Sequence, residues 1–91
     1  MTATIEVERL SANQFRVRVI EGRSETSHEV TLGPDDYQRL ADGKSQPEEL
    51  VRRSFEFLLE REPKESILAR FELPVIERYF PEYEREIKRR L

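Results

Sequence analysis

Residues 47–61, PEELVRRSFEFLLER, are predicted to form a central helix around which the other elements pack, because they alone are long enough and apolar enough. At about 100° per residue, the apolar side chains of this stretch fall within roughly 200° of the helix circumference. They are Leu50, Val51, Phe55, Phe57, Leu58 and Leu59, with Ser54 among them. Pro63 disfavours helical geometry at Glu62 and so marks the end of the helix. An apolar face this wide must be covered by other elements on more than one side.

The first elements that can cover the helix are two alternating stretches near the N-terminus. In residues 4–10, Ile5 and Val7 alternate with polar side chains, and in residues 14–20 Phe15, Val17 and Val19 do the same, which is the period of a β-strand. An antiparallel hairpin that keeps these side chains on one face also places acidic residues opposite basic ones. The pairs that this register predicts are Val7 with Val17, Glu8 with Arg16, and Glu6 with Arg18.

A third strand is predicted at residues 28–32, after a polar turn at residues 21–26 that contains Gly22. The predicted pairs are Phe15 with Leu32, Val17 with Val30, Val19 with His28, and Arg18 with Glu29. In this register the second strand lies in the middle, and Arg18 lies between Glu6 and Glu29 on the outer face. The sequence therefore predicts a three-stranded antiparallel meander with one charged face and one apolar face.

The rest of the chain predicts helices. A proline and two acids at residues 34–36 are typical of a helix start, and Gly43 is placed to end that short helix. Beyond the central helix, apolar spacing of i, i+1 and i+4 predicts two short helices at residues 65–71 and 74–80. An amphipathic tail helix is predicted at residues 82–91, after Pro81 interrupts the chain.

The predicted fold class is therefore α+β: an N-terminal three-stranded antiparallel β-meander packed against a central helix and followed by short C-terminal helices. We expect residues 1–91 to form a single domain, in which residues 1–33 are the meander and residues 34–91 are the helical part. A chain of 91 residues suits one domain with one modest core. The sequence contains no internal repeat that would suggest another arrangement.

The amino-acid composition limits the cellular compartments and the kinds of functional site that we expect for this protein. The chain has no cysteine, hence no disulfide framework and no thiolate metal site. Its net charge of −3 disfavours nucleic-acid binding, which depends on an excess of lysine and arginine. No stretch approaches the roughly 18 apolar residues of a membrane span, and the N-terminus lacks a signal-peptide pattern. We expect a cytoplasmic protein that contacts no membrane and binds no metal or other cofactor.

Three aromatic residues near the C-terminus, Tyr79, Phe80 and Tyr83, form the first candidate site. A domain this small is not expected to bury all three rings, and exposed aromatic patches mark protein–protein contacts. The favoured hypothesis is a non-enzymatic interaction module. Its partner would be another protein or, in a homodimer, a second copy of the chain.

Two other function classes remain open. Residues 65–80 have the outline of a helix-turn-helix, with residues 74–80 as the reading helix of a small DNA-binding regulator or antitoxin-like protein. That helix offers only Glu77 and Arg78 as polar contacts, so two core-packing helices are the favoured interpretation. An enzyme is the third hypothesis, with His28 as general base. No nucleophile or carboxylate has a recognisable spacing from His28, so a core-edge histidine with a local hydrogen bond is favoured, and we predict no enzymatic activity.

The C-terminal half also resembles a known group of proteins. The segments EREPKESIL and RYFPEY, within residues 50–87, resemble the C-terminal part of a family of small uncharacterised bacterial proteins. The resemblance covers about 40 of the 91 residues. It implies a single bacterial cytoplasmic domain and supplies no catalytic or binding residue. The predicted strands also resemble, in outline only, the sheet-plus-helix domains of small antitoxins.

Overall fold

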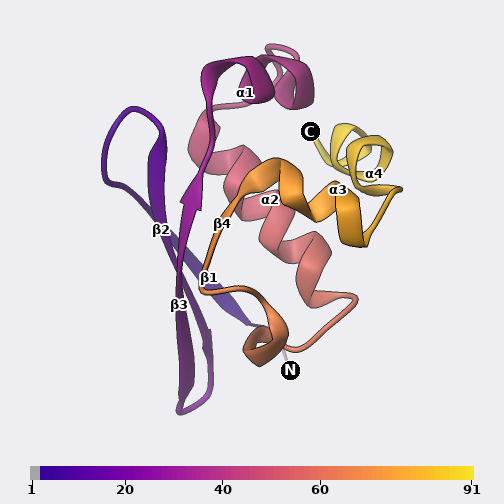
Figure 1. The fold of residues 1–91 in the computed structure, drawn as a ribbon. Coiled ribbons are helices and arrows are strands. Elements are labelled where there is room, and N and C mark those ends of the chain that lie inside the picture. Colours follow the sequence, from indigo (N-terminus) through magenta and orange to yellow (C-terminus); the bar gives the residue numbers. More distant parts are fainter. Residues whose placement is uncertain (1–2) are drawn as a thin grey trace.

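The computed structural model describes residues 3–91 as a mixed β-sheet with helices packed on one of its faces (Figure 1). The strands are β1 (Thr4–Arg9), β2 (Gln14–Glu21), β3 (Ser24–Thr31) and β4 (Arg70–Glu72). The α-helices are α1 (Pro34–Ala41), α2 (Pro47–Leu59), α3 (Ile76–Tyr79) and α4 (Tyr83–Arg90), and the 3-10 helices are η1 (Lys64–Ser66) and η2 (Leu73–Val75). The predicted α+β class is confirmed. The predicted antiparallel meander is present as β1, β2 and β3, but β4 joins the sheet as a fourth strand, parallel to β3, so the strand order is β1-β2-β3-β4.

The β1–β2 hairpin has the predicted register, with Val7 opposite Val17. The predicted charge pairs form on its outer face: Arg16 lies 3.3 Å from a carboxylate oxygen of Glu8. The valine and phenylalanine side chains of β2 point the other way and are buried against the helices. Opposite charges across the hairpin and burial on one face favour the same register, so the two signals reinforce each other.

The register predicted between β2 and β3 is wrong by two residues. Val17 lies opposite His28, whereas the prediction placed it opposite Val30. The turn is shorter than predicted, because only Gly22 and Arg23 separate the last paired residues of the two strands. Gly22 has a φ of 61°, a conformation that glycine adopts readily and that two-residue hairpin turns require.

A shift of two residues leaves every side chain on its predicted face but changes the ion pairs. Arg18 lies between Glu6 and Glu25, 2.8 Å from a carboxylate oxygen of each, and does not pair with Glu29. Glu29 pairs instead with Arg70 of β4 at 3.3 Å. The outer face is therefore charged as predicted, with different partners.

The helix predicted at residues 65–71 is wrong, because these residues contain the end of η1 and the start of β4. β4 runs parallel to β3, and the Glu29 N–H donates to the Ala69 carbonyl at 2.8 Å. Phe71 points toward Phe55 of α2, with ring centroids 6.0 Å apart. An isolated helix this short is marginal, whereas an extended chain satisfies the backbone groups at the edge of β3. The pairing of β4 with β3 therefore outweighs the helix-like spacing of the apolar residues in this segment.

The helix-turn-helix that was the alternative interpretation of residues 65–80 is accordingly absent. Its first helix is replaced by β4, and its second is the short pair η2 and α3. A DNA-reading helix of this type needs a preceding helix that crosses the DNA backbone. The regulator hypothesis thus loses the motif on which it depended.

The predicted central helix is confirmed as α2, which ends at Leu59 and not at Arg61. Its apolar face contacts β1 and also the helices α1 and α4, so it is covered on several sides as its width requires. α1 also follows the prediction, beginning at Pro34 and ending at a left-handed Asp42–Gly43 pair. The fully buried side chains of the core come from sheet and helices: Phe15, Val17, Val19, Val30, Leu40, Leu50, Val51, Phe55, Phe57, Leu73, Tyr83 and Ile87.

Candidate functional site

The three predicted interaction residues occupy three different environments. Tyr79 on α3 is 64% exposed, Phe80 is half-buried, and Tyr83 at the start of α4 is fully buried. Phe80 and Tyr83 both pack edge-on against Phe57 of α2, with centroid distances of 5.9 and 5.3 Å. The prediction that all three rings share one exposed patch is therefore wrong for Tyr83. Pro81 lies between Phe80 and α4, and the chain beyond it lies back over α2.

Tyr83 can be buried because its hydroxyl has a partner on α2. The Ser54 hydroxyl donates to the Leu50 carbonyl at 2.8 Å, so the Tyr83 hydroxyl must donate to Ser54 Oγ, at 2.6 Å. Burial raises the pKa of Tyr83 well above its ordinary value, because the phenolate would lose its hydration. A serine on the apolar face of the predicted central helix was the available sequence signal, since a buried hydroxyl requires a partner.

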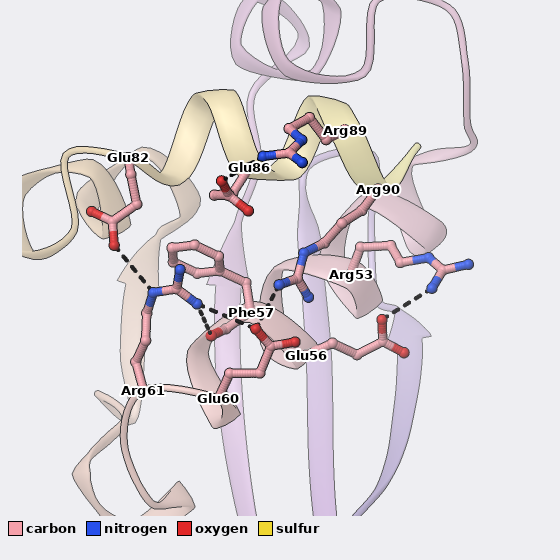
Figure 2. Close-up of polar contacts among 9 residues, drawn as sticks. All are labelled: Arg53, Glu56, Phe57, Glu60, Arg61, Glu82, Glu86, Arg89 and Arg90. Carbon is pink, nitrogen blue, oxygen red and sulfur yellow. Dashed lines mark hydrogen bonds and ion pairs between the residues drawn. The ribbon is translucent and has the colours of Figure 1, made fainter.

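Arginines close the contact between α2 and α4, which we call the α2–α4 seam (Figure 2). The Arg61 guanidinium lies over the Phe57 ring, 3.6 Å from its centroid, and donates to the Phe57 carbonyl at 3.1 Å. Arg90 approaches the same ring from α4, at 5.7 Å. Such cation–π contacts add to the packing of the ring.

Carboxylates complete the α2–α4 seam. Glu60 accepts from Arg90 at 2.6 Å, and Glu82 accepts from Arg61 at 3.2 Å (Figure 2). The hydrogen bond from Arg90 lowers the pKa of Glu60. Backbone hydrogen bonding and then the Arg61 side chain lower the pKa of Glu82. The aromatic side chains and charges at this seam are therefore largely satisfied within the protein.

An apolar groove lies beside this seam, between the end of α2, the segment from η1 to β4, and α3. Its cavity has a volume of about 110 Å³. Two of the three large hydrophobic side chains exposed among residues 3–91, Leu68 (46%) and Tyr79 (64%), line this groove. The residues that line it are Leu58, Glu62, Ser66, Ile67, Leu68, Phe71, Val75, Ile76, Tyr79 and Phe80.

Extended backbone before β4 exposes Leu68. Ile67 has an extended conformation and is buried, so Leu68, the next residue, lies on the opposite side of the chain. The Leu68 carbonyl accepts a hydrogen bond from His28 Nδ1 at 2.8 Å, which holds this segment against β3. The sequence prediction missed Leu68 because a helix over these residues would have placed Ile67 and Leu68 on one apolar face.

His28 is buried and forms hydrogen bonds through both ring nitrogens. Because a carbonyl can only accept, Nδ1 carries the proton toward Leu68, and Nε2 accepts from the Thr26 hydroxyl at 2.8 Å. The ring also packs against Phe55, with a centroid distance of 5.4 Å. This is the core histidine with local hydrogen bonds that we favoured over a general base. Neither partner is a carboxylate.

A more open polar depression adjoins the apolar groove along β4. It is lined by Gln14, Glu29, Thr31, Leu68, Arg70, Phe71, Glu72 and Val75. Leu68, Phe71 and Val75 line both hollows, so they form the boundary between them. The two hollows together give the molecule a surface with an apolar centre and a charged margin.

Within residues 3–91, no three histidine, aspartate or glutamate side chains gather as they would around a metal ion. None of the helices in this described part has the length and apolar character needed to cross a membrane.

No protein-family model, curated protein sequence or solved structure matches the chain. The resemblance to small bacterial proteins through EREPKESIL and RYFPEY therefore stays a prediction. The candidate site consists of the apolar groove and the polar depression, and its interpretation depends on their geometry alone.

Proposed function

We propose that this protein is a non-enzymatic interaction module that binds a short segment of a partner protein in the apolar groove. The observation that carries the proposal is the convergence of Leu68 and Tyr79, two well-exposed hydrophobic side chains, on one cavity. Exposed apolar surface that is contiguous and rimmed by polar residues is typical of contact sites and ligand-binding grooves. The predicted residues Tyr79 and Phe80 belong to this surface, and Leu68 takes the place of Tyr83.

The size of the cavity supports a side chain as its occupant. Sites for drug-sized ligands commonly measure roughly 300–1,000 Å³, and an apolar cavity of about 150 Å³ holds one benzene. The apolar groove has about 110 Å³, enough for one anchoring apolar side chain. Protein interfaces often concentrate their binding energy in such an anchor, surrounded by contacts that exclude water.

A random dodecapeptide display library tests this proposal directly. Selection on immobilised wild-type protein should enrich peptides that share an apolar anchor, and those peptides should lose binding to the variant Leu68→Gln. Leu10→Gln is the matched control, because Leu10 is a leucine of similar exposure (41%) outside the groove. Circular dichroism and thermal melting should show that both variants keep the wild-type fold.

Two results of the library selection would contradict the proposal. One is a library that yields no enriched peptide; the other is peptides that bind wild type, Leu68→Gln and Leu10→Gln equally. Sedimentation velocity of the wild type and Leu68→Gln is a second test, which asks whether a second copy of the chain occupies the groove. Self-association lost in Leu68→Gln would identify a second copy of this chain as the occupant, in place of a separate partner.

A further inference from the structure

Most of the acidic side chains are already paired within the protein. Of the 19 aspartates and glutamates, all but five lie within ion-pair distance of a lysine or arginine in residues 3–91. The five are Asp35, Asp42, Glu48, Glu62 and Glu72. A carboxylate that lacks a partner in so densely paired a surface requires an explanation.

Local backbone geometry explains three of the five. Asp35 and Glu48 lie in the first turns of α1 and α2, where the helix dipole favours a negative charge. Asp42 is the left-handed C-cap residue of α1, a conformation that aspartate tolerates better than most residues. Only Glu62 and Glu72 then lack a local role.

Glu62 lies where a negative charge is unfavourable. Its backbone N–H donates to the Leu58 carbonyl at 2.9 Å, so it follows directly on the C-terminal end of α2. The negative end of a helix dipole disfavours a carboxylate. Glu62 also lines the apolar groove, where there is little else to compensate its charge.

Glu72 lies on the other side of the same surface, in the polar depression. Among residues 3–91, the one cation that lines either hollow is Arg70, and Glu29 pairs with it at 3.3 Å. The lining of the two hollows thus contains three carboxylates and one guanidinium. A ligand that fills the apolar groove would meet an uncompensated carboxylate on each side of the boundary formed by Leu68, Phe71 and Val75.

We infer that the partner of this surface is a cationic polypeptide segment: one apolar side chain enters the apolar groove, and neighbouring lysine or arginine side chains pair with Glu62 and Glu72. The inference rests on the proposed function and adds the charge of the partner to it. Charge complementarity of this kind fixes the register of binding and excludes acidic competitors. It also disfavours nucleic acid, whose phosphates these carboxylates would repel.

The test uses the same dodecapeptide library and synthetic copies of the peptides that it selects. On the wild type, selection should enrich lysine and arginine within a few positions of the apolar anchor. Affinity for the double variant Glu62→Gln/Glu72→Gln should fall by about three- to tenfold, as expected for two exposed ion pairs. The loss should be smaller at high salt, because screening already weakens the wild-type contacts.

A matched control is the double variant Asp35→Asn/Asp42→Asn, which changes the net charge equally at carboxylates outside both hollows. It should bind the selected peptides as the wild type does. Peptides that depend on Leu68 but lack basic residues, or that bind both double variants equally, would overturn this inference and leave the proposed function standing. If no selected peptide depends on Leu68, or if the groove is filled by a second copy of the chain, the proposed function fails together with the inference.

Discussion

Two regions border the C-terminal half of α2, and each presents aromatic rings to it. At the α2–α4 seam, Tyr83 is fully buried, its hydroxyl is bonded to Ser54, and arginines cover Phe57. At the apolar groove, Tyr79 and Leu68 remain exposed around a cavity. Tyr79 and Tyr83 are only four positions apart in sequence, and yet their surroundings differ.

Burial of a ring here follows from whether its polar atoms and its edges find partners. The Tyr83 hydroxyl has a buried partner, whereas the exposed Tyr79 hydroxyl forms no side-chain hydrogen bond among residues 3–91. We expect the seam to contribute mainly to folding stability and the groove mainly to binding. Each prediction below tests that division.

The largest effect is expected for Tyr83→Ala at the seam. Removing a fully buried aromatic ring leaves a cavity against Phe57, and such substitutions cost about 3–5 kcal/mol. Urea titration monitored by circular dichroism should show the midpoint falling with little change in slope. A loss below about 1 kcal/mol would show that α4 is not tightly packed.

The next largest loss of stability is expected for the buried hydroxyl pair of Ser54 and Tyr83, and it should differ between the two residues. Ser54→Ala removes the acceptor of the Tyr83 hydroxyl and leaves a buried donor without a partner, which costs about 1–3 kcal/mol. Tyr83→Phe removes that donor itself and should cost about 1 kcal/mol or less, since Ser54 keeps its bond to the Leu50 carbonyl. Adding Tyr83→Phe to Ser54→Ala should restore part of the lost stability; equal or additive losses would refute the assigned donor direction.

Arg61→Ala should destabilise the protein by about 1 kcal/mol, through loss of the Phe57 cation–π contact and the bond to the Phe57 carbonyl. Arg61→Lys should recover only part of this, because an ammonium cannot stack on the ring and donate in several directions at once. Chemical denaturation of the three proteins side by side measures the effect. A lysine variant as stable as wild type would exclude a role for the planar guanidinium.

The Glu60–Arg90 pair predicts a small dependence of stability on pH. The pKa of Glu60 is lowered in the folded protein, so the pair stabilises fully above the ordinary glutamate pKa. The contribution is lost as the pH falls through the lowered value. For so exposed a pair it amounts to no more than about 1 kcal/mol. The stability difference between wild type and Glu60→Gln should therefore shrink as the pH falls from 6 to 3. A difference that grows on acidification would contradict the predicted direction of this pH dependence.

The smallest effect is expected at the groove. Tyr79→Ala removes a ring that is 64% exposed and should change stability by less than about 0.5 kcal/mol. The same variant should weaken binding of peptides selected on the wild type. A stability loss close to that of Tyr83→Ala would erase the distinction between the two regions.

The sequence predicted well the parts of the fold in which local pattern and charge agree. The β1–β2 register followed from both apolar alternation and the acid–base pairs, and α2 followed from a wide apolar face ended by Pro63. The β2–β3 register was wrong by two residues because apolar alternation repeats at that interval. Only the two-residue Gly22–Arg23 turn distinguishes the two registers.

The site was harder to predict, because it depends on contacts between distant segments. β4 forms against the edge of β3, and this contact turns Leu68 outward. No local spacing in residues 65–71 distinguishes that strand from a short helix. The burial of Tyr83 likewise depends on Ser54, which precedes it by 29 residues. The exposure of Tyr79 and the partial exposure of Phe80 were predictable, because aromatic residues close together exceed what a small core can hold.

The shortness of β4 has a consequence for how long the groove persists. Only three residue pairs join β4 to β3, and their partners come from opposite halves of the chain. Closing so long a loop for so few bonds is entropically unfavourable, so we expect this edge to form late in folding and to separate transiently before the rest of the sheet. Because Leu68 and Phe71 are held in place by that edge, each such opening would disrupt the apolar groove and release any segment bound there, while the core stays intact.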